Sequence, residues 1–362
     1  MQIKKKLIKM NRMYIIFFSS ILFINILFFI PSNANSFKIT DLEISEPFDL
    51  NFNKEKVIDK GFEIGFNRLV SMVTTSDQTE KLNKTSLKEI KALIDSFIVR
   101  DERFINDEYF TTLDVNFNKK DTLIFFEQNN IFPSIPIKKN ILTIPVLVDL
   151  QLNKIFLFTN NIFYKNWNTE HKNFFLINHL LPSEDLEDVE LINQNSNSIE
   201  EYDFKEIINR YDLKNYIVTI IYKDNNNYKI LSKIKLNQSL VIHNQKFENI
   251  DLTNSKNINE VINQLKTVYE NYWKKINQIN TSIKLPLTVS INSKQNKKIQ
   301  IFEKTLSKID LVSYFDIVKF DNQKTYFKII YNGSPKKFID DLKENNIIII
   351  SKNQIWEVEW KI

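Results

Sequence analysis

The sequence predicts a mixed α/β protein of the α+β kind, built from several units. Short segments with alternating apolar residues are typical of strands, and segments with an apolar residue every three to four positions are typical of helices. The chain has 362 residues, which is enough for two or three domains of ~100–200 residues each. Aromatic residues make up 13% of it and Cys is absent, so apolar packing without disulfides has to hold the core.

Residues 1–34 are predicted to form a secretory signal peptide. Four lysines and Arg12 precede the apolar run Met13–Ile30, and Ser32-Asn33-Ala34 follows as a small-x-small cleavage site. A retained membrane anchor is the alternative, because the run is near the lower limit of the ~17–25 residues that span a bilayer. We therefore expect the rest of the chain in the periplasm, either released or anchored at the inner membrane.

The predicted leader also accounts for the net charge of the chain. Residues 1–34 hold five basic and no acidic residues, which leaves 44 of each sign in the remainder. A nucleic-acid binder usually keeps a basic surface in its folded part, and none is evident here. Only three Gly are present, whereas phosphate-binding loops need clustered glycines. We predict no nucleic acid, no nucleotide and no cofactor.

The segment 35–150 is predicted to form an N-terminal β-α-α-β-α-β unit. Alternation from Phe37 to Ile44 indicates the first strand, with a bulge at Asp41. The second helix begins with a capping box, in which Ser86 and Glu89 satisfy each other's backbone amides. The expected elements are strand 37–44, helices 53–73 and 86–97, strand 109–118, a short helix from 121 and the buried strand 144–148.

Two of the three glycines lie one turn apart in the first predicted helix. Gly61 and Gly65 each lower helix stability by about 1 kcal/mol relative to Ala, so a packing reason is expected. Close contact between the helix backbone and the sheet is the first interpretation. A helix–helix contact with a partner protein is the alternative.

The segment 151–281 is predicted to form a middle α/β unit with an antiparallel meander. Strands 216–222 and 228–236 flank Asp224-Asn225-Asn226-Asn227, and Asn and Asp tolerate the left-handed conformations of hairpin turns. A third strand follows at 239–242, and apolar residues at helical spacing predict a long helix over 258–276.

The segment 282–362 has the order β-α-β-β-α-β, which is that of a ferredoxin-like module. Its second helix is predicted to open at Ser334-Pro335, since Pro is favoured at the first helical position. The expected elements are strand 285–291, helix 297–309, strands 314–320 and 326–331, the helix after Pro335, and final strands at 347–350 and 356–360.

Histidines are the first candidates for catalysis, and the chain has three, His171, His179 and His243. If 170–181 is helical, His171 and His179 lie two turns apart, which is the wrong spacing for a metal pair at i and i+4. We expect these histidines to lie at the surface or to be hydrogen-bonded, and we predict no metal site.

Clustered carboxylates are the second candidates. The first cluster consists of Glu184, Asp185, Glu187, Asp188 and Glu190. Ser183 as N-cap, with acids in the first helical turn stabilised by the helix dipole, explains these residues, and a calcium site is the alternative. The second cluster consists of Asp101, Glu102, Asp107 and Glu108, which bracket a predicted loop, and a carboxylate pair for glycan cleavage is the alternative.

Aromatic residues are the last candidates. Phe163, Tyr164 and Trp167 resemble a ligand platform, but a core cluster is the simpler interpretation. Trp273, Trp356 and Trp360 are likewise expected to be structural. No residue is therefore predicted to be catalytic, to bind a cofactor or to bind a metal.

Five segments carry a resemblance to a known family. They are the helix that contains Arg68-Leu69-Val70, Leu113-Asp114-Val115-Asn116-Phe117 before a short helix, Pro145-Val146-Leu147-Val148, Leu181-Pro182 before the acidic helix, and the C-terminal half. In these segments the chain resembles an uncharacterised bacterial envelope family, domain of unknown function 2066. The family's Arg-Pro lead into the buried strand is replaced by Thr143-Ile144-Pro145. The layout is also similar to periplasmic modules of flagellar-assembly and Tol-type proteins, which implies an assembly role and no catalytic residues.

These observations together predict an exported, non-enzymatic periplasmic protein that binds other envelope proteins. Its exposed sheet edges, or the helix with Gly61 and Gly65, are the expected contact surfaces. Two alternatives remain open: an envelope hydrolase that uses carboxylates, and a membrane-anchored protein that binds a ligand with the aromatic residues near Trp167.

Overall fold

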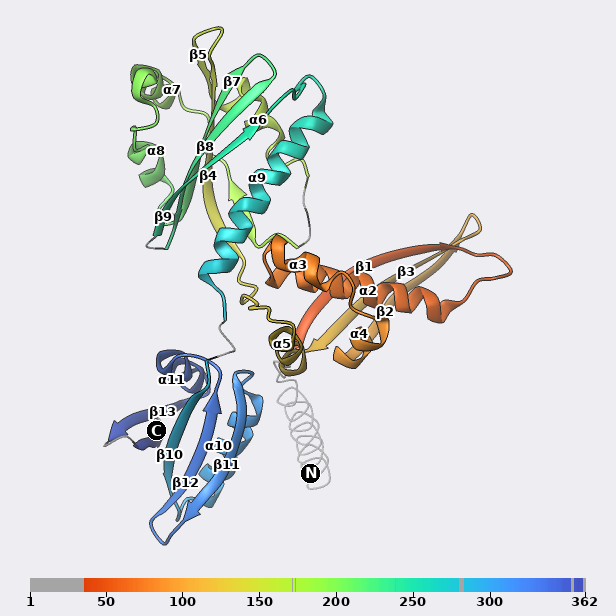
Figure 1. The fold of residues 1–362 in the computed structure, drawn as a ribbon, viewed down its shortest axis with the longest axis vertical. Coiled ribbons are helices and arrows are strands. Elements are labelled where there is room, and N and C mark those ends of the chain that lie inside the picture. The colour runs from red at the N-terminus through yellow and green to blue at the C-terminus, as the bar shows by residue number, and fades with distance from the viewer. Residues whose placement is uncertain are drawn as a thin grey trace, which may run out of the picture. The chain divides into compact units, whose positions relative to one another are not determined.

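The computed structural model describes residues 36–362, apart from 171, 173, 238, 280–282, 353, 354, 361 and 362. The predicted leader, residues 1–34, lies outside the described residues. The described part is a mixed α+β fold, as predicted, and it contains ten α-helices and three sheets (Figure 1). Within it, no helix combines the length and the apolar character needed to cross a membrane.

The N-terminal sheet has three antiparallel strands in the order β1-β3-β2. Its register shifts between Ile39 and Leu42, and Asp41 has a φ of 55°, which confirms the predicted bulge. Helix α2 starts at Asn53, whose side chain accepts from the amides of Glu55 and Lys56. The elements are β1 (Ser36–Pro47), α2 (Lys54–Val73), α3 (Ser76–Leu82), α4 (Leu87–Leu93), β2 (Ile94–Ile105), β3 (Glu108–Asn118) and α5 (Lys119–Gln128).

Strand β2 corrects the predicted order. The capping box of Ser86 and Glu89 does start α4, but the helix ends at Leu93, and 94–105 pairs with β3 along its length. A two-residue turn connects the two strands, and both Asn106 (φ 53°) and Asp107 (φ 61°) adopt the left-handed conformation that such turns need. Pairing with β3 therefore overrides the helical spacing of the apolar residues.

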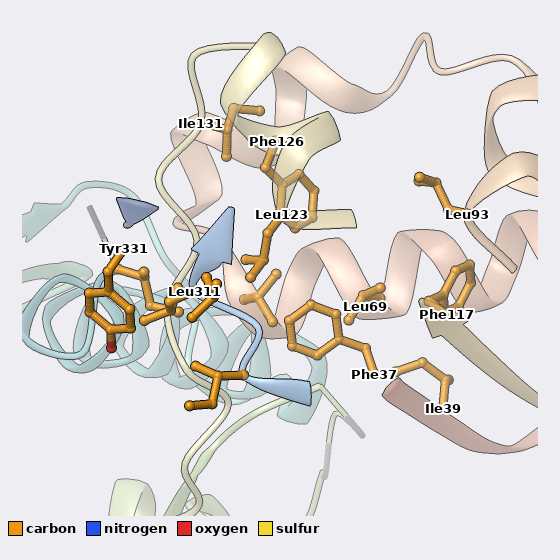
Figure 2. Packing of buried hydrophobic residues seen from close by; sticks show 14 of the residues in the cluster. Phe37, Ile39, Leu69, Leu93, Phe117, Leu123, Phe126, Ile131, Leu311 and Tyr331 are labelled. Atoms are coloured by element: carbon orange, nitrogen blue, oxygen red, sulfur yellow. The ribbon is translucent and has the colours of Figure 1, made fainter. Parts of the chain in front are cut away.

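The two glycines of α2 face the sheet. A Cβ on Gly61 would lie 2.4 Å from Leu113 Cδ1 and 2.6 Å from Ile44 Cδ1, and one on Gly65 would lie 3.0 Å from Leu42 Cδ1. Side chains of the sheet thus occupy this side of the helix, which confirms close packing and leaves no room there for a partner. Figure 2 shows the surrounding cluster, with Phe37, Ile39, Leu69, Phe117 and Leu123 among its members.

The middle sheet has six strands in the order β5-β4-β7-β8-β9, with β6 paired to β4. Strand β4 was expected in the N-terminal sheet, but it pairs in parallel with β6 and β7. Its continuous apolar run fits this place, since parallel strands are buried on both faces. The elements are β4 (Lys139–Asp149), β5 (Lys154–Phe156), α6 (Ile162–Asn166), β6 (Ile177–Leu180), α7 (Leu186–Gln194), α8 (Lys205–Arg210), β7 (Tyr216–Asp224), β8 (Asn227–Leu236), β9 (Ser239–Phe247) and α9 (Ser255–Ile276), with short 3-10 turns at Phe158–Asn160 and Ser196–Ser198.

Helices cover both faces of the middle sheet. Helix α9 buries Ile262, Leu265 and Tyr269 against one face, and Ile207 of α8 belongs to the cluster on the other face (Figure 1). The hairpin between β7 and β8 turns at Asn225 and Asn226, as predicted from the asparagine run.

The C-terminal sheet has the strand order β11-β12-β10-β14-β13. The predicted β-α-β-β-α-β order holds through β13, but the chain then forms a hairpin, and β14 lies between β10 and β13, parallel to β10. Ser334 caps the last helix and Pro335 is its first residue, as predicted. The elements are β10 (Leu285–Asn292), α10 (Asn296–Lys308), β11 (Val312–Phe320), β12 (Lys324–Tyr331), α11 (Pro335–Glu344), β13 (Ile347–Lys352) and β14 (Ile355–Trp360).

Candidate functional site

Of the four carboxylates near Asp101, those of Asp101 and Glu102 have side-chain partners. Glu102 lies on β2, accepts from the Tyr109 hydroxyl and pairs with the Lys54 amine at 2.6 Å. The bonds from Lys54 and Tyr109 hold the pKa of Glu102 below its ordinary value, which is the opposite of what a general acid needs. Asp101 pairs with Arg103, and Asp107 lies in the β2–β3 turn. The structure therefore gives Asp101 and Glu102 structural partners.

The acids from Glu184 to Glu190 surround the start of α7. The N-cap is Asp185 and not the predicted Ser183, because the Asp185 carboxylate accepts from the amide of Glu187. Arg210 of α8 binds both Asp185, at 3.0 Å, and the buried Asp188. One guanidinium thus joins the two helices. In the described part of the chain, no three His, Asp or Glu side chains are placed to hold a metal ion.

The three histidines have different environments. His171 lies outside the described residues, and His243 lies on β9 with its ring 6.0 Å from that of Tyr272. The segment 170–181 is not the helix considered from sequence, because 177–180 form β6 in parallel with β4. His179 on this strand is 5% exposed, and its Nδ1 lies 2.7 Å from Thr143 Oγ1.

The aromatic residues near Trp167 form a core cluster. Phe163 and Trp167 have no exposed surface, and the Trp167 ring stacks on Tyr269 with 6.5 Å between ring centroids. The His179 ring packs against the same indole at 5.8 Å. These rings are covered and do not form an exposed platform, so the core interpretation is confirmed.

Helix α9 carries a buried charged stripe that the sequence did not reveal. Lys266, Glu270 and Lys274 recur every four residues, and each is at most 5% exposed. The Lys266 amine donates to the Trp167 carbonyl oxygen, and the Lys274 amine donates to that of Ser71. A charge at every fourth position of a helix normally indicates a face exposed to solvent. In the sequence, only the apolar residues next to these three positions argued against an exposed face.

Glu270 connects the middle of this stripe to the start of β6. Its Oε1 accepts from the backbone amides of Leu176, at 2.8 Å, and Ile177, at 2.6 Å. Burial raises the pKa of Glu270, although the two amides and Lys274 oppose the shift. Burial likewise lowers the pKa of Lys274. The carboxylate therefore holds β6 in place beside α9.

A cavity of about 670 Å³ opens beside β6 and α9. Lys138, Lys139, Lys172 and Lys266 line it together with His179, and we call it the lysine cavity. Three asparagine side chains and an apolar wall that includes Phe175 complete the lining. Among the described residues that line it there is no Asp or Glu. Its lining can therefore attract a negatively charged group and also contact an apolar one.

Burial sets the electrostatics of the lysine cavity. It lowers the pKa of Lys266 to about 8, with Glu170 opposing the shift. It also lowers the pKa of His179 to about 3, and the nearby Lys266 lowers it further. His179 is therefore neutral at pH 7, and its Nε2 has no hydrogen-bond partner in the part of the chain that the structure describes.

Exposed apolar side chains are concentrated on edge strands. Strand β11 pairs with β12 along one edge only, and within the described residues its other edge has no strand partner. Phe320 is 67% exposed and Val318 55%, and Tyr314 and Ile317 are also exposed. The same holds for edge strand β2, where the exposed residues are Phe97, Ile98, Phe104 and Ile105.

Comparisons with known proteins found no protein-family model that matches the chain and no matching curated protein. The resemblance to domain of unknown function 2066 therefore stays a prediction.

Proposed function

We propose that this chain is an exported, non-enzymatic protein that binds other envelope proteins by adding one of their strands to edge strand β11. The observation that supports the proposal best is the exposed apolar row on this strand, which includes Tyr314, Ile317, Val318 and Phe320. Export rests on the predicted leader, residues 1–34, and the proposal of a non-enzymatic role is supported by the ion pairs that Glu102 and Asp188 form.

An open edge with apolar side chains favours pairing with an extended chain. Each unpaired residue along β11 offers backbone groups to a partner strand, and the side chains on both faces can fill pockets of the partner. Soluble proteins usually protect such edges with charges, and β11 carries only Asp316 and Lys319 among its exposed apolar residues. Lys319 already lies over the Tyr326 ring, at 5.2 Å from its centroid.

Site-specific photo-crosslinking in the cells that produce the full chain tests this proposal. A photoreactive amino acid at position 318 is expected to form an adduct with a distinct envelope protein. The substitution Ile317→Lys in the same chain should abolish the adduct, because a charge on an exposed edge opposes strand addition. Leu186 of α7 is the matched control, since it is apolar and 82% exposed but lies on a helix.

The results separate the proposal from other kinds of contact. The same crosslinker at position 186 should give no such adduct, and Leu186→Lys should leave the adduct at position 318 unchanged. Identical products at both positions, or an adduct that survives Ile317→Lys, would contradict strand addition at β11. An adduct between two copies of the chain would contradict the proposed envelope partner and would show that β11 mediates self-association.

A further inference from the structure

We propose that the lysine cavity of the middle unit binds the phosphate group of a small ligand. This site is separate from β11 and does not depend on the function proposed above. The cavity, about 670 Å³ in volume, is lined by Lys138, Lys139, Lys172 and Lys266. Such a volume holds a metabolite-sized molecule, since ligand pockets commonly have ~300–1,000 Å³.

The lysines are available to a ligand because their charge is not neutralised locally. Within the described residues, Lys138, Lys139 and Lys172 form no ion pair, and Lys266 donates only to the Trp167 carbonyl oxygen. The nearest acid named in the electrostatics of Lys266 is Glu170, whose two carboxylate oxygens accept from Asn259 and Asn263. An incoming anion would supply the missing counter-charge.

His179 supplies a second and independent indication. Its side chain is buried and lines the cavity, and its Nε2 lacks a partner among the described residues. An unsatisfied buried polar atom destabilises a fold by ~1–3 kcal/mol, so such atoms are uncommon without a functional reason. If the Thr143 hydroxyl donates to Nδ1, the ring carries its proton on Nε2. This atom is enclosed in the structure, so it can donate to an anion once the side chains that cover it move aside.

The number of charges favours phosphate over carboxylate. A phosphate monoester carries about −1.5 to −2 charges at pH 7 and has three acceptor oxygens, which suits several amines and an imidazole. A single carboxylate would leave most of the lysine charge unpaired. Phe175, Leu176 and Leu213 also line the cavity and provide an apolar surface for the organic part of the ligand.

Calorimetry with the full chain tests the site. Inorganic phosphate and glycerol 3-phosphate are the soluble probes, and phosphatidylcholine vesicles with and without phosphatidic acid test a lipid source of the same group. Lys266→Met is expected to weaken binding by at least about tenfold, because it removes a buried charge–charge contact. Lys275→Met on the exposed side of α9 is the matched control and should bind like the unaltered chain.

A second variant covers the case in which Lys266→Met fails to fold. Lys138→Gln combined with Lys139→Gln changes residues that are not buried, so the fold is retained, and it should weaken binding and reduce its dependence on salt. A His171→Gln, His243→Gln chain leaves His179 as the remaining histidine, and its imidazole ¹⁵N signals should shift when phosphate is added. These signals report the cavity directly.

The outcomes decide whether phosphate is the group that this cavity binds. The site is supported if a soluble probe, or only the vesicles with phosphatidic acid, bind to the unaltered chain and to Lys275→Met but bind weakly or not at all to the cavity variants. Which probe binds then shows whether the phosphate group comes from a soluble ligand or from a lipid. Absence of binding to every probe overturns it. Acetate is titrated as the comparison anion with a single carboxylate. If it binds as tightly as phosphate, or if phosphate affinity is unchanged in both cavity variants, the proposal is also overturned.

Discussion

His179 and Lys266 lie in the same buried environment, where the His179 imidazole is neutral and lies near the Lys266 amine. Burial lowers the pKa of both groups, and the amine lowers that of the histidine further. The Lys266 amine still reaches the Trp167 carbonyl oxygen, so the charged form has one strong acceptor. Placing these groups inside the protein makes its stability depend on pH.

We predict that the protein loses stability as the pH falls from 7 to 5, and that His179 causes much of the loss. The unfolded chain binds a proton on this histidine below pH 6.5, whereas the folded protein binds it only near pH 3. Stability therefore rises with pH between these values, by up to ~1.4 kcal/mol per pH unit. Urea unfolding of the protein and of His179→Gln at pH 5 and pH 7 measures the difference.

The control for this prediction is His243→Gln on β9. It should keep the pH dependence of the unaltered chain, while His179→Gln should lose about 2 kcal/mol of the change between pH 7 and pH 5. Equal pH dependence in all three proteins would show that His179 is not buried in its neutral form.

Residues of the candidate site were the hardest to predict from sequence. The surroundings of His179 depend on the pairing of β6 with β4 and on contacts with α9, which lies 76 or more residues later. Lys266 and Glu270 follow the same four-residue spacing as solvated charges, and only the packing of α9 on the sheet buries them. Caps such as Asn53 and Ser86 were predictable, because their partners lie within three residues.

Helix α2 illustrates how an element is fitted to its sheet, and we predict different responses at its two glycines. Gly61→Ala should destabilise the protein, since the new methyl group meets Leu113 and Ile44 at 2.4 and 2.6 Å. Overpacking of this kind costs about 1–3 kcal/mol, which exceeds the ~1 kcal/mol gained in helix propensity. The midpoint of urea unfolding measures the change.

Gly65→Ala is the matched comparison in the same helix. Its Cβ would lie 3.0 Å from Leu42 Cδ1 and 3.7 Å from its next neighbours, so a small movement accommodates it. We expect the gain in helix propensity to offset this contact to within about 1 kcal/mol. A Gly65→Ala protein that is less stable than Gly61→Ala would contradict the packing described for α2.

Local sequence patterns predicted most elements. They failed where the structure of a segment depends on the strand with which it pairs. The meander and α9 were predicted because turn residues and apolar spacing indicate them directly. Residues 94–97 were assigned to a helix because Ile94 and Phe97 continue the spacing of α4. The pairing of 94–105 with β3 depends instead on the turn at Asn106 and Asp107. Strand β4 was recognised as buried, but a buried apolar run does not indicate which sheet it joins.

The chain as a whole has balanced charge outside its predicted leader, and this balance leads to a prediction about processing. If residues 1–34 are removed, the protein recovered from the envelope begins at Asn35 and carries 44 basic and 44 acidic residues. Mass spectrometry of the intact protein, purified from the cells that produce it, measures its N-terminus. A protein that still begins at Met1 would contradict cleavage and support the anchored alternative.

The C-terminal hairpin places a late segment of the chain in the interior of a sheet. Strand β14 separates β10 from β13 and is the last strand in chain order, so the sheet cannot be completed until residues 355–360 have been synthesised. Until β14 has been synthesised, β10 and β13 each have an unpaired edge. A truncation just before β14 therefore removes an inner strand of the sheet and not an edge strand. We therefore expect proteases to degrade chains truncated before β14 faster than the full chain.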